Sequence, residues 1–367
     1  MPTKKILLLS AYDAVSHQHW RKGLVAAFPE YEWTLLTLPP RHFAWRIRSN
    51  SLSWAYSERA TLEQGFDLII ATSMTDLSAL KGMVPSIANT PSLLYFHENQ
   101  FDYPASGNEH QSIEPKITSI YAALSATRIA FNSDYNRKSF LRGADELLQR
   151  MPDHVPPNLD KRLREHSQVL PVPLKDDWFE PVTTRAEKFT LLWNHRWEYD
   201  KAPERLFSAL LRLRETGADF KVHVVGQQFR KSPIIFDQIR DELSGYIGEW
   251  GYIEDINRYR EIISESHVVV STSLHDFQGL SILEAVAAGC IPVVPDRLAY
   301  PEYIPEQFRY PSFIEAPEKE SEALQLRLTD IYLQFSVGNL PPAPDISALK
   351  WEKMSPSYRT MIDALLA

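Results

Sequence analysis

A chain of 367 residues is long enough for two domains, and apolar and charged fractions of 44% and 23% exclude a disordered or fibrous protein. A net charge of −8 excludes a surface that is basic throughout, although basic clusters occur at 41–48, 137–142 and 161–164. The single cysteine, Cys290, excludes a disulfide framework, and no apolar run approaches the length of a membrane span. Both features favour a cytoplasmic protein that does not bind membranes.

Apolar runs typical of strands that are buried on both faces recur along the chain. In the first half they occupy 5–12, 33–39, 66–73, 91–97, 128–133 and 169–174. In the second half they occupy 189–195, 221–227, 251–253, 267–273 and 290–296. The segments between them have the length of crossover helices, and the leucines of 203–215 lie three and four residues apart. The pattern predicts an α/β protein with two doubly wound, Rossmann-like domains.

Prolines and the lack of any period at 171–189 predict the domain boundary there. We therefore expect an N-terminal domain at 1–175 and a C-terminal domain at 185–340. A second proline-rich stretch, 337–345, precedes an amphipathic segment. We expect this last segment, 345–367, to be helical and to pack back on the N-terminal domain.

Two carboxylates, Asp276 and Glu284, flank a predicted helix start in the stretch LHDFQGLSILEAVAAGCIPVV at 274–294. The helix is expected to begin near Leu280 and to end at Gly289, before the next strand. Its first N–H groups would face outward at the carboxyl end of the sheet and favour an anion. The carboxylates could accept hydrogen bonds from sugar hydroxyls; alternatively, Glu284 caps its own helix.

The stretch resembles the donor-site motif of retaining glycosyltransferases with the GT-B fold, in which two Rossmann-like domains face each other across a cleft. The resemblance implies that Glu284 holds the ribose of the nucleotide and that Asp276 holds the transferred hexose. This sequence departs from the usual motif by having Asp276 in place of Glu and Gln278 before the glycine. Further donor contacts are implied for His275, Phe277, Gln278, Gly279, Leu280 and Ser281.

A second stretch, NHRWEYDKAPERL at 194–206, resembles the diphosphate site of the same family. The resemblance implies that Arg196 and Lys201 neutralise the diphosphate, which gains negative charge as the sugar bond breaks. No metal or other cofactor is then required. The alternative is that both cations simply lie on the surface at a helix start. Weaker resemblances imply donor contacts from Asn194, Gly226, Gln227, Tyr252 and Ile253.

Polar side chains follow two predicted strands of the first half, in AYDAVSHQHW at 11–20 and in FHENQ at 96–100. The histidines of HQH lack a third ligand at a suitable spacing, so no metal site is predicted. We expect Ser16 and His17 to contact the donor and His97 to contact the hexose from the other side of the cleft. The expected acceptor contacts are Arg46, Arg48, Glu98, Asn99, Gln100 and Asn132.

FHENQ, NSDYN at 132–136, SH at 16–17 and NHRWEYDK at 194–201 together resemble the tRNA-queuosine α-mannosyltransferase family. The resemblance implies GDP-mannose as the nucleotide-sugar co-substrate and retention of the anomeric configuration. It implies queuosine in the anticodon loop of tRNA-Asp as the acceptor. The basic clusters of the first half fit an RNA partner.

Three alternatives remain open at the level of the sequence. A transferase of the same fold could use another nucleotide sugar and a lipid, glycan or small-molecule acceptor. A sugar-nucleotide epimerase would need an acid or base in the first half, and Glu98 is the candidate. The departure at Asp276 also leaves room for a non-catalytic protein that binds nucleotide sugars or RNA. The sequence predicts no oligomeric state.

Overall fold

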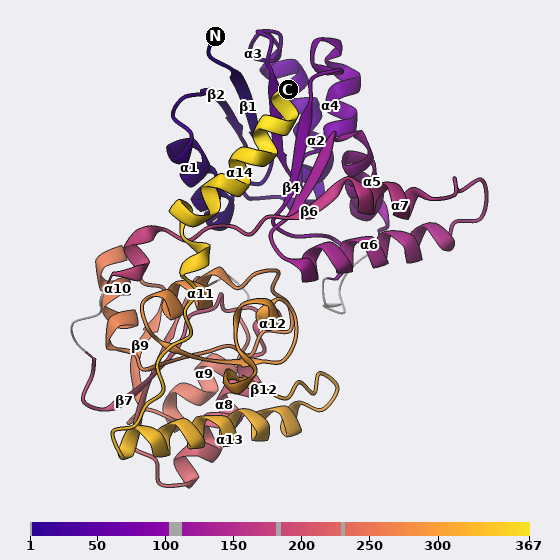
Figure 1. The fold of residues 1–367 in the computed structure, drawn as a ribbon. Coiled ribbons are helices and arrows are strands. Elements are labelled where there is room, and N and C mark those ends of the chain that lie inside the picture. The colour runs from indigo at the N-terminus through magenta and orange to yellow at the C-terminus, as the bar shows by residue number, and fades with distance from the viewer. Residues whose placement is uncertain (1, 103–111, 181–184, 229–231) are drawn as a thin grey trace. The chain divides into compact units, whose positions relative to one another are not determined.

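The computed structural model describes residues 2–102, 112–180, 185–228 and 232–367. The chain divides into two compact units, Met1–Pro173 with Trp351–Ala367, and Leu174–Lys350. Each unit contains a six-stranded parallel sheet with helices packed on it (Figure 1). The predicted α/β class with two doubly wound domains is therefore confirmed. The division after Pro173 falls inside the proline-rich stretch 171–189, of which 181–184 lies outside the described residues.

The strand order of the first sheet is β2-β1-β3-β4-β5-β6. The strands are β1 (Lys5–Ser10), β2 (Glu32–Thr37), β3 (Leu68–Thr72), β4 (Ser92–Phe96), β5 (Arg128–Phe131) and β6 (Ser167–Val169). All residues of β3 and β4 are buried, which explains their continuous apolar runs. The prediction of a strand at 169–174 is wrong beyond Val169, because Pro171 and Pro173 lack the N–H groups that a ladder requires.

Helices cover both faces of this sheet. The alternate residues Leu7 and Leu9 of β1 face a core shared with α2, α4, α5 and α6. On the opposite face, Trp20 of α1 stacks on Tyr95 of β4. The Trp20 indole N–H donates to the Tyr358 hydroxyl of α14 at 2.9 Å, so the C-terminal helix packs on the first unit. The helices are α1 (Val15–Ala27), α2 (Phe43–Ser57), α3 (Arg59–Leu62), α4 (Leu77–Met83), α5 (Glu114–Ser125), α6 (Asp134–Gln149), α7 (Leu159–Glu165) and α14 (Trp351–Leu366).

The second sheet has the strand order β12-β11-β10-β7-β8-β9. Its strands are β7 (Phe189–Trp193), β8 (Phe220–Val225), β9 (Ile247–Gly251), β10 (Val268–Val270), β11 (Ile291–Pro295) and β12 (Arg309–Tyr310). The prediction of a strand at 251–253 is wrong, because β9 ends at Gly251. This edge strand is half-buried over most of its length, so it shows no continuous apolar run. The two-residue strand β12 was not predicted.

The helices of the second unit are α8 (Pro203–Glu215), α9 (Ile235–Glu242), α10 (Ile256–Glu265), α11 (Leu280–Ala287), α12 (Tyr300–Tyr303) and α13 (Pro317–Ser336). Single 3₁₀ turns complete the two units at η1 (Pro85–Ile87), η2 (Asp176–Phe179), η3 (Tyr199–Lys201), η4 (Glu306–Phe308) and η5 (Ser347–Leu349). Across the described ranges, every helix is too short or too polar to traverse a bilayer.

Candidate functional site

The loops that leave β7, β8 and β10 contain most of the residues predicted to bind the donor. In the sheet β7 lies between β10 and β8, and all three strands run parallel. The segments 194–201, 226–227 and 271–279 therefore leave the same edge, formed by the carboxyl ends of the strands. Open parallel sheets bind their ligands at this edge. The sheet order thus brings together segments that are far apart in the sequence.

Lys201 is a buried cation between two carboxylates. Its Nζ donates to the His275 carbonyl oxygen at 2.5 Å and lies 3.3 Å from Asp200 Oδ2 and 3.6 Å from Asp276 Oδ2. The residue is only 6% exposed. Burial alone would raise the pKa of both carboxyl groups, but the Lys201 ammonium, together with the other neighbouring charges and hydrogen bonds, outweighs burial and holds both pKa values below their ordinary range. Both carboxylates are therefore charged, and Lys201 is fixed in place by them.

Arg196 joins this group from the more exposed side. Its Nη1 lies 2.8 Å from Glu198 Oε2, its Nη2 lies 3.8 Å from Asp200 Oδ2, and its side chain is 47% exposed. Asp200 therefore contacts both predicted diphosphate ligands. Asp200 was not among the predicted site residues, although it directly precedes Lys201 in the stretch 194–206. A carboxylate beside a predicted phosphate-binding lysine is the signal that could have identified it.

The loop before α11 is held by Asp276 and Gly279. Asp276 Oδ1 accepts the Gly279 backbone N–H at 2.8 Å, and Gly279 has a left-handed backbone with φ of 76°. A Cβ at this position would also lie 2.9 Å from the ring of Tyr300, so a glycine is required for two reasons. No side chain caps α11, and the capping role considered for Glu284 is not seen. Within the part of the chain that the structure describes, the N–H groups that follow Gly279 in the first turn are therefore not held by a side-chain cap.

Asn194 and Glu284 form the second part of the site, at α11. The Asn194 amide donates to the Ser281 carbonyl oxygen and to the Tyr259 hydroxyl, both at 2.9 Å. Its Oδ1 is buried and finds no hydrogen-bond partner within the described residues. Glu284 lies in the second turn of α11, where burial raises its pKa to about 7, with Lys175 opposing the rise. An unpartnered amide oxygen and a carboxyl group of high pKa can both bind hydroxyl groups of a ligand.

Gly226 ends β8 against the backbone of the β7 loop. A Cβ there would lie 1.8 Å from the His195 carbonyl oxygen, and the Gly226 N–H donates to the Gly251 carbonyl oxygen at 3.0 Å. The next residue, Gln227, is exposed, and its carbonyl oxygen accepts the Trp197 N–H at 2.9 Å. These contacts fix the path of the loop that carries Arg196.

The remaining donor-side residues differ in exposure. Tyr252 is 58% exposed, whereas Ile253 packs against the core of the second unit. Phe277 is buried with its ring edge-on to His275 at 4.7 Å, and Gln278 is buried beside it. Leu280 and Ser281 are partly buried at the start of α11.

His195 is a buried neutral histidine that the sequence analysis did not select. Burial, together with the Lys201 ammonium, lowers its pKa to about 3. Its Nε2 lies 3.0 Å from the Ser271 hydroxyl at the end of β10. The neutral ring thus connects the β7 and β10 loops without adding positive charge.

In the first unit His17 and His97 form a stacked pair, with ring centroids 4.2 Å apart. His97 directly follows β4, and His17 lies in the first turn of α1, next to the exposed Ser16. Burial lowers the pKa of both rings, so both are neutral. His17 Nδ1 and His97 Nε2 are buried and find no hydrogen-bond partner within the described residues. The pair can therefore offer ring nitrogens to a polar ligand.

Asn99 and Asn132 hold the loop that follows His97. The buried Asn99 amide donates to Asn136 and Ser139, and its Oδ1 accepts the Phe101 N–H at 2.9 Å. Asn132 donates to the His97 carbonyl oxygen at 2.9 Å. Both amides are thus engaged inside the unit.

Glu98 and Gln100 flank Asn99 and are both partly exposed. The Glu98 charge opposes the lowering of the His17 pKa, which places the carboxylate near the histidine pair. The Gln100 amide lies 3.9 Å from the sulfur of Met74.

Arg46 and Arg48, the cations predicted to bind the acceptor, differ in their contacts. Arg48 Nε lies 2.9 Å from Glu114 Oε1, and its Nη1 lies 3.4 Å from Asp76 Oδ2. Arg46 is partly buried on the same helix, α2. The Arg48 charge is therefore already balanced by two acidic groups.

Solved structures share this architecture. Sucrose-phosphate synthase from Thermosynechococcus elongatus matches with a TM-score of 0.69 at 15% identity, covering 99% of this chain and 100% of that chain. HepE of Anabaena, solved in complex with UDP, matches with a TM-score of 0.65 at 13% identity, covering 99% and 100%. These likenesses show that the two doubly wound units form the GT-B fold.

Sequence comparisons identify the kind of GT-B protein that this chain resembles. The profile of the group 1 glycosyltransferases matches 175–334, and that of the N-terminal domain of tRNA-queuosine alpha-mannosyltransferase matches 5–174. The Drosophila melanogaster protein named tRNA-queuosine alpha-mannosyltransferase is 29% identical over 316 residues, which cover 83% of each chain. The chain is a glycosyltransferase, and its N-terminal half matches the tRNA-queuosine alpha-mannosyltransferase family, as its motifs predicted.

Proposed function

We propose that this chain transfers mannose from GDP-mannose to queuosine in the anticodon loop of tRNA-Asp, with retention of the anomeric configuration. The name of the Drosophila relative supports the reaction, and the UDP bound to HepE supports a nucleotide-sugar donor in this fold. The observation that carries the proposal is the position of Lys201 beside Arg196 at the carboxyl edge of the second sheet.

The diphosphate of the donor binds Arg196 and Lys201. An ammonium group has three N–H donors; Lys201 donates one to the His275 carbonyl oxygen, and its charge pairs with Asp200 and Asp276. We assign a remaining N–H to a phosphate oxygen. As the bond between the mannose and the diphosphate breaks, negative charge develops on the diphosphate, and the two cations stabilise it. The free N–H groups at the start of α11 add to this stabilisation.

The nucleoside of the donor binds between β7 and α11. Glu284 accepts hydrogen bonds from the ribose hydroxyls, and Asn194 lies beside it with a free amide oxygen. The raised pKa of Glu284 shows that its surroundings do not favour the ionised carboxylate. Hydrogen-bond donors of a bound ribose would stabilise that ionised form. Tyr252 and Ile253 are assigned to the base.

We assign the hexose hydroxyls of the donor to Asp276. His97, whose neutral ring nitrogen Nε2 has no hydrogen-bond partner within the described residues, keeps its assignment to the hexose. The acceptor hydroxyl of queuosine attacks the anomeric carbon on the face that the diphosphate leaves. Its proton passes to the leaving phosphate oxygen, so the step needs no protein nucleophile. A cytoplasmic location belongs to the same proposal, because the acceptor is a tRNA.

The test uses the purified full chain with tRNA that contains queuosine and with matched tRNA that lacks it. GDP-mannose, GDP-glucose and the corresponding UDP-sugars are offered one at a time, and the nucleosides are analysed by mass spectrometry. We expect one hexose on queuosine with GDP-mannose and no product on tRNA without queuosine. Transfer from UDP-sugars alone would overturn the donor assignment. Absence of any hexosylated nucleoside would overturn the acceptor assignment.

A further inference from the structure

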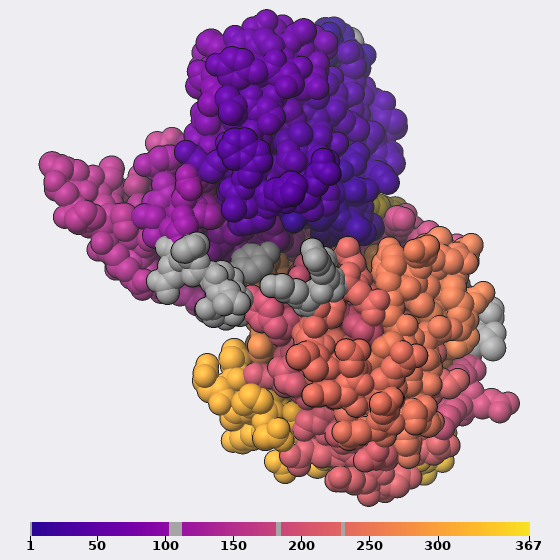
Figure 2. Space-filling view, turned by 180° about the vertical axis from the view of Figure 1, so that it is seen from behind, coloured from indigo at the N-terminus to yellow at the C-terminus, as the bar shows by residue number. Residues whose placement is uncertain are grey.

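Two basic segments that lie apart in the sequence meet at the edge of the first sheet. The Arg137 guanidinium of α6 donates to the Arg164 carbonyl oxygen of α7 at 3.1 Å and to the Ser167 hydroxyl at 2.9 Å. The clusters 137–142 and 161–164 of the sequence thus share one surface. The α6–α7 segment projects from the side of the first unit as the magenta lobe of Figure 2.

Arg128 and His166 extend this surface. Arg128 begins β5, and the N–H of the next residue, Ile129, donates to the His166 carbonyl oxygen at 2.9 Å. The His166 ring nitrogen Nδ1 lies 2.8 Å from the Arg162 carbonyl oxygen. Five basic residues therefore surround the end of α7 and the start of the edge strand β6. We call them the edge basic cluster: Arg128, Arg137, Arg162, Arg164 and His166.

The charges of the edge basic cluster are not balanced locally. Within the described ranges, none of its five side chains forms an ion pair with an Asp or Glu, and Arg128, Arg162 and Arg164 are exposed. Arg48 differs from the arginines of the edge basic cluster, because it forms ion pairs with Glu114 and Asp76. Stabilisation of a helix C-terminus could account for Arg162 and Arg164. It does not account for Arg128, which lies on a strand, or for Arg137, which lies near the start of α6.

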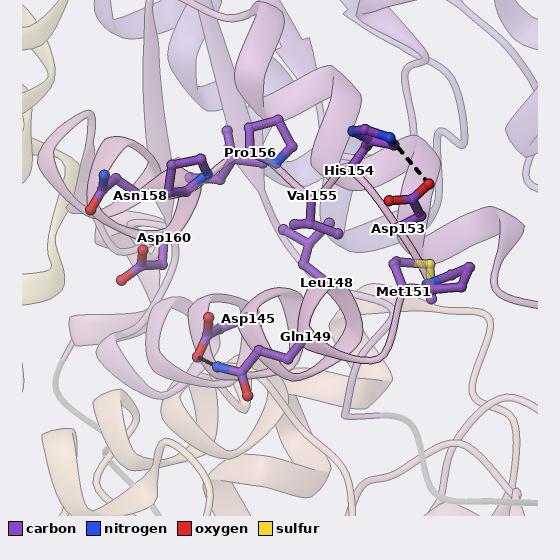
Figure 3. Close-up of a pocket in the computed structure, with 13 residues that line it drawn as sticks. Asp145, Leu148, Gln149, Met151, Asp153, His154, Val155, Pro156, Asn158 and Asp160 are labelled. Carbon is purple, nitrogen blue, oxygen red and sulfur yellow. Dashed lines mark hydrogen bonds and ion pairs between the residues drawn. The ribbon is translucent and has the colours of Figure 1, made fainter.

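Acidic groups lie at the opposite end of α7. A cavity of about 350 Å³ separates α6 from the connection to α7, and Asp145, Asp153 and Asp160 are among the residues that line it (Figure 3). Asp145 accepts from Gln149 and Asp153 pairs with His154, so the two carboxylates are engaged within the cavity wall. The α7 helix thus separates an acidic wall from a basic edge. Of these two surfaces, the basic edge is the one that favours a polyanion.

We propose that the edge basic cluster binds the phosphate backbone of the RNA acceptor; this inference rests on the proposed function. Unpaired, exposed arginines arranged along one edge suit a polyanion, because they lose little solvation and release counterions from the RNA. Arg128 lies at the amino end of β5, about 13 Å along the strand from its carboxyl end, where Asn132 follows and where the proposed function places the acceptor. That span corresponds to a few nucleotides of RNA.

The test compares two matched double variants. Arg162→Gln/Arg164→Gln removes two cations from the last turn of α7. Arg212→Gln/Arg214→Gln removes two cations with the same spacing from the last turn of α8 in the second unit. Each variant is titrated with queuosine-containing tRNA at several salt concentrations, and KM for tRNA and kcat are measured. Thermal unfolding checks that each fold is intact.

The α7 variant should raise Kd and KM for tRNA about tenfold at 0.15 M salt and lower the slope of log K against log salt by about 1 to 2. Its kcat should stay within twofold, and the α8 variant should match the wild type. The inference would be overturned if the α7 variant kept its tRNA affinity, or if both variants lost affinity equally. Binding to anionic vesicles is measured in parallel, and a variant that loses vesicle binding but keeps tRNA binding would also overturn it. If the wild type binds tRNA through this cluster but transfers no mannose, the inference stands and the proposed function fails. If the wild type transfers mannose and the α7 variant binds tRNA as the wild type does, the proposed function stands and the inference fails.

Discussion

Asp200 and Lys201, adjacent in the sequence, form a buried ion pair with 3.3 Å between Oδ2 and Nζ. The same carboxylate oxygen lies 3.8 Å from Arg196 Nη2. One acidic side chain therefore positions both cations that we assign to the diphosphate.

Lys201→Met should weaken GDP binding about 10- to 100-fold, because the phosphate loses a desolvated charge-assisted hydrogen bond. It should also lower the stability of the fold, since Asp200 and Asp276 lose their shared counter-charge. Calorimetric titration with GDP measures the first effect and thermal unfolding the second. Lys188→Met removes the exposed partner of Asp219 in the same unit and is the control. Equal GDP affinities for the wild type and Lys201→Met would contradict the phosphate assignment.

At pH 8, Glu284→Gln should raise the stability of the fold but weaken the binding of GDP. The folded-state pKa of Glu284, about 7, lies above its ordinary value of 4.5, so the folded state binds its proton more tightly than the unfolded state does. The resulting contribution to stability is complete below about pH 4.5 and is lost as the pH rises past about 7. At pH 8 we therefore expect Glu284→Gln to be more stable than the wild type, by roughly 1 to 3 kcal/mol.

The same variant should bind GDP more weakly at pH 8, because an amide replaces the ionised carboxylate as acceptor for the ribose. In the wild type, GDP affinity should fall as the pH drops below about 7, and this decrease should be smaller in Glu284→Gln. Titrations from pH 5.5 to 8.5 measure both. Parallel pH profiles for the two proteins would show that Glu284 does not contact the nucleotide.

Glu320→Gln should destabilise the second unit strongly. Glu320 is fully buried between Arg205, at 2.6 Å, and Arg297, at 2.7 Å, and Arg297 donates to the Ser273 carbonyl oxygen before the His275 loop. Burial would raise the pKa of Glu320, but the hydrogen bond and charge of Arg297, with further hydrogen bonds from Arg205 and the Phe313 N–H, outweigh it and lower the pKa. The ionised Glu320 carboxylate therefore contributes to the free energy of unfolding above its ordinary pKa of 4.5, and this contribution is lost as the pH falls.

Loss of this buried charge should cost about 3 to 5 kcal/mol, because two buried arginines lose their shared partner. Urea unfolding at pH 7 measures the difference. Glu318→Gln is the matched control on the same helix: its partner Arg212 lies 2.9 Å away, but the Glu318 side chain is 77% exposed. The control should change stability by less than about 0.5 kcal/mol. Similar losses in the two variants would mean that burial of the ion pair is unimportant.

Gly226→Ala should impair donor binding through the backbone. The new Cβ would lie 1.8 Å from the His195 carbonyl oxygen, so the loop that carries Arg196 must move. We expect destabilisation of about 1 to 3 kcal/mol and a marked loss of GDP affinity. Gly245→Ala is the control, because nothing lies within 4 Å of its Cβ position. Wild-type GDP affinity in Gly226→Ala would show that the Arg196 loop need not keep this path.

The sequence alone determined the elements and several special positions. Continuous apolar runs predicted the buried strands, since such runs follow from burial on both faces of a sheet. The leucine spacing of 203–215 predicted α8, whose observed bounds are the same. Gly279 and Gly289 were placed at the two ends of α11, and both adopt left-handed backbones, which is a local preference of glycine. The motifs also predicted the glycosyltransferase family that the comparisons show.

Only the tertiary structure decided which of these residues act together. Asp200 became recognisable as a shared partner because the sheet order places β7 beside β10 and brings Lys201 to Asp276. The half-buried edge strand β9 lacked a periodic signal, so its bounds came from its pairing with β8. Arg48 looked like a free cation in the sequence, but its acidic partners come from other segments of the first unit. Periodicity and turn chemistry are local properties, whereas charge pairing depends on segments that meet only after the chain has folded.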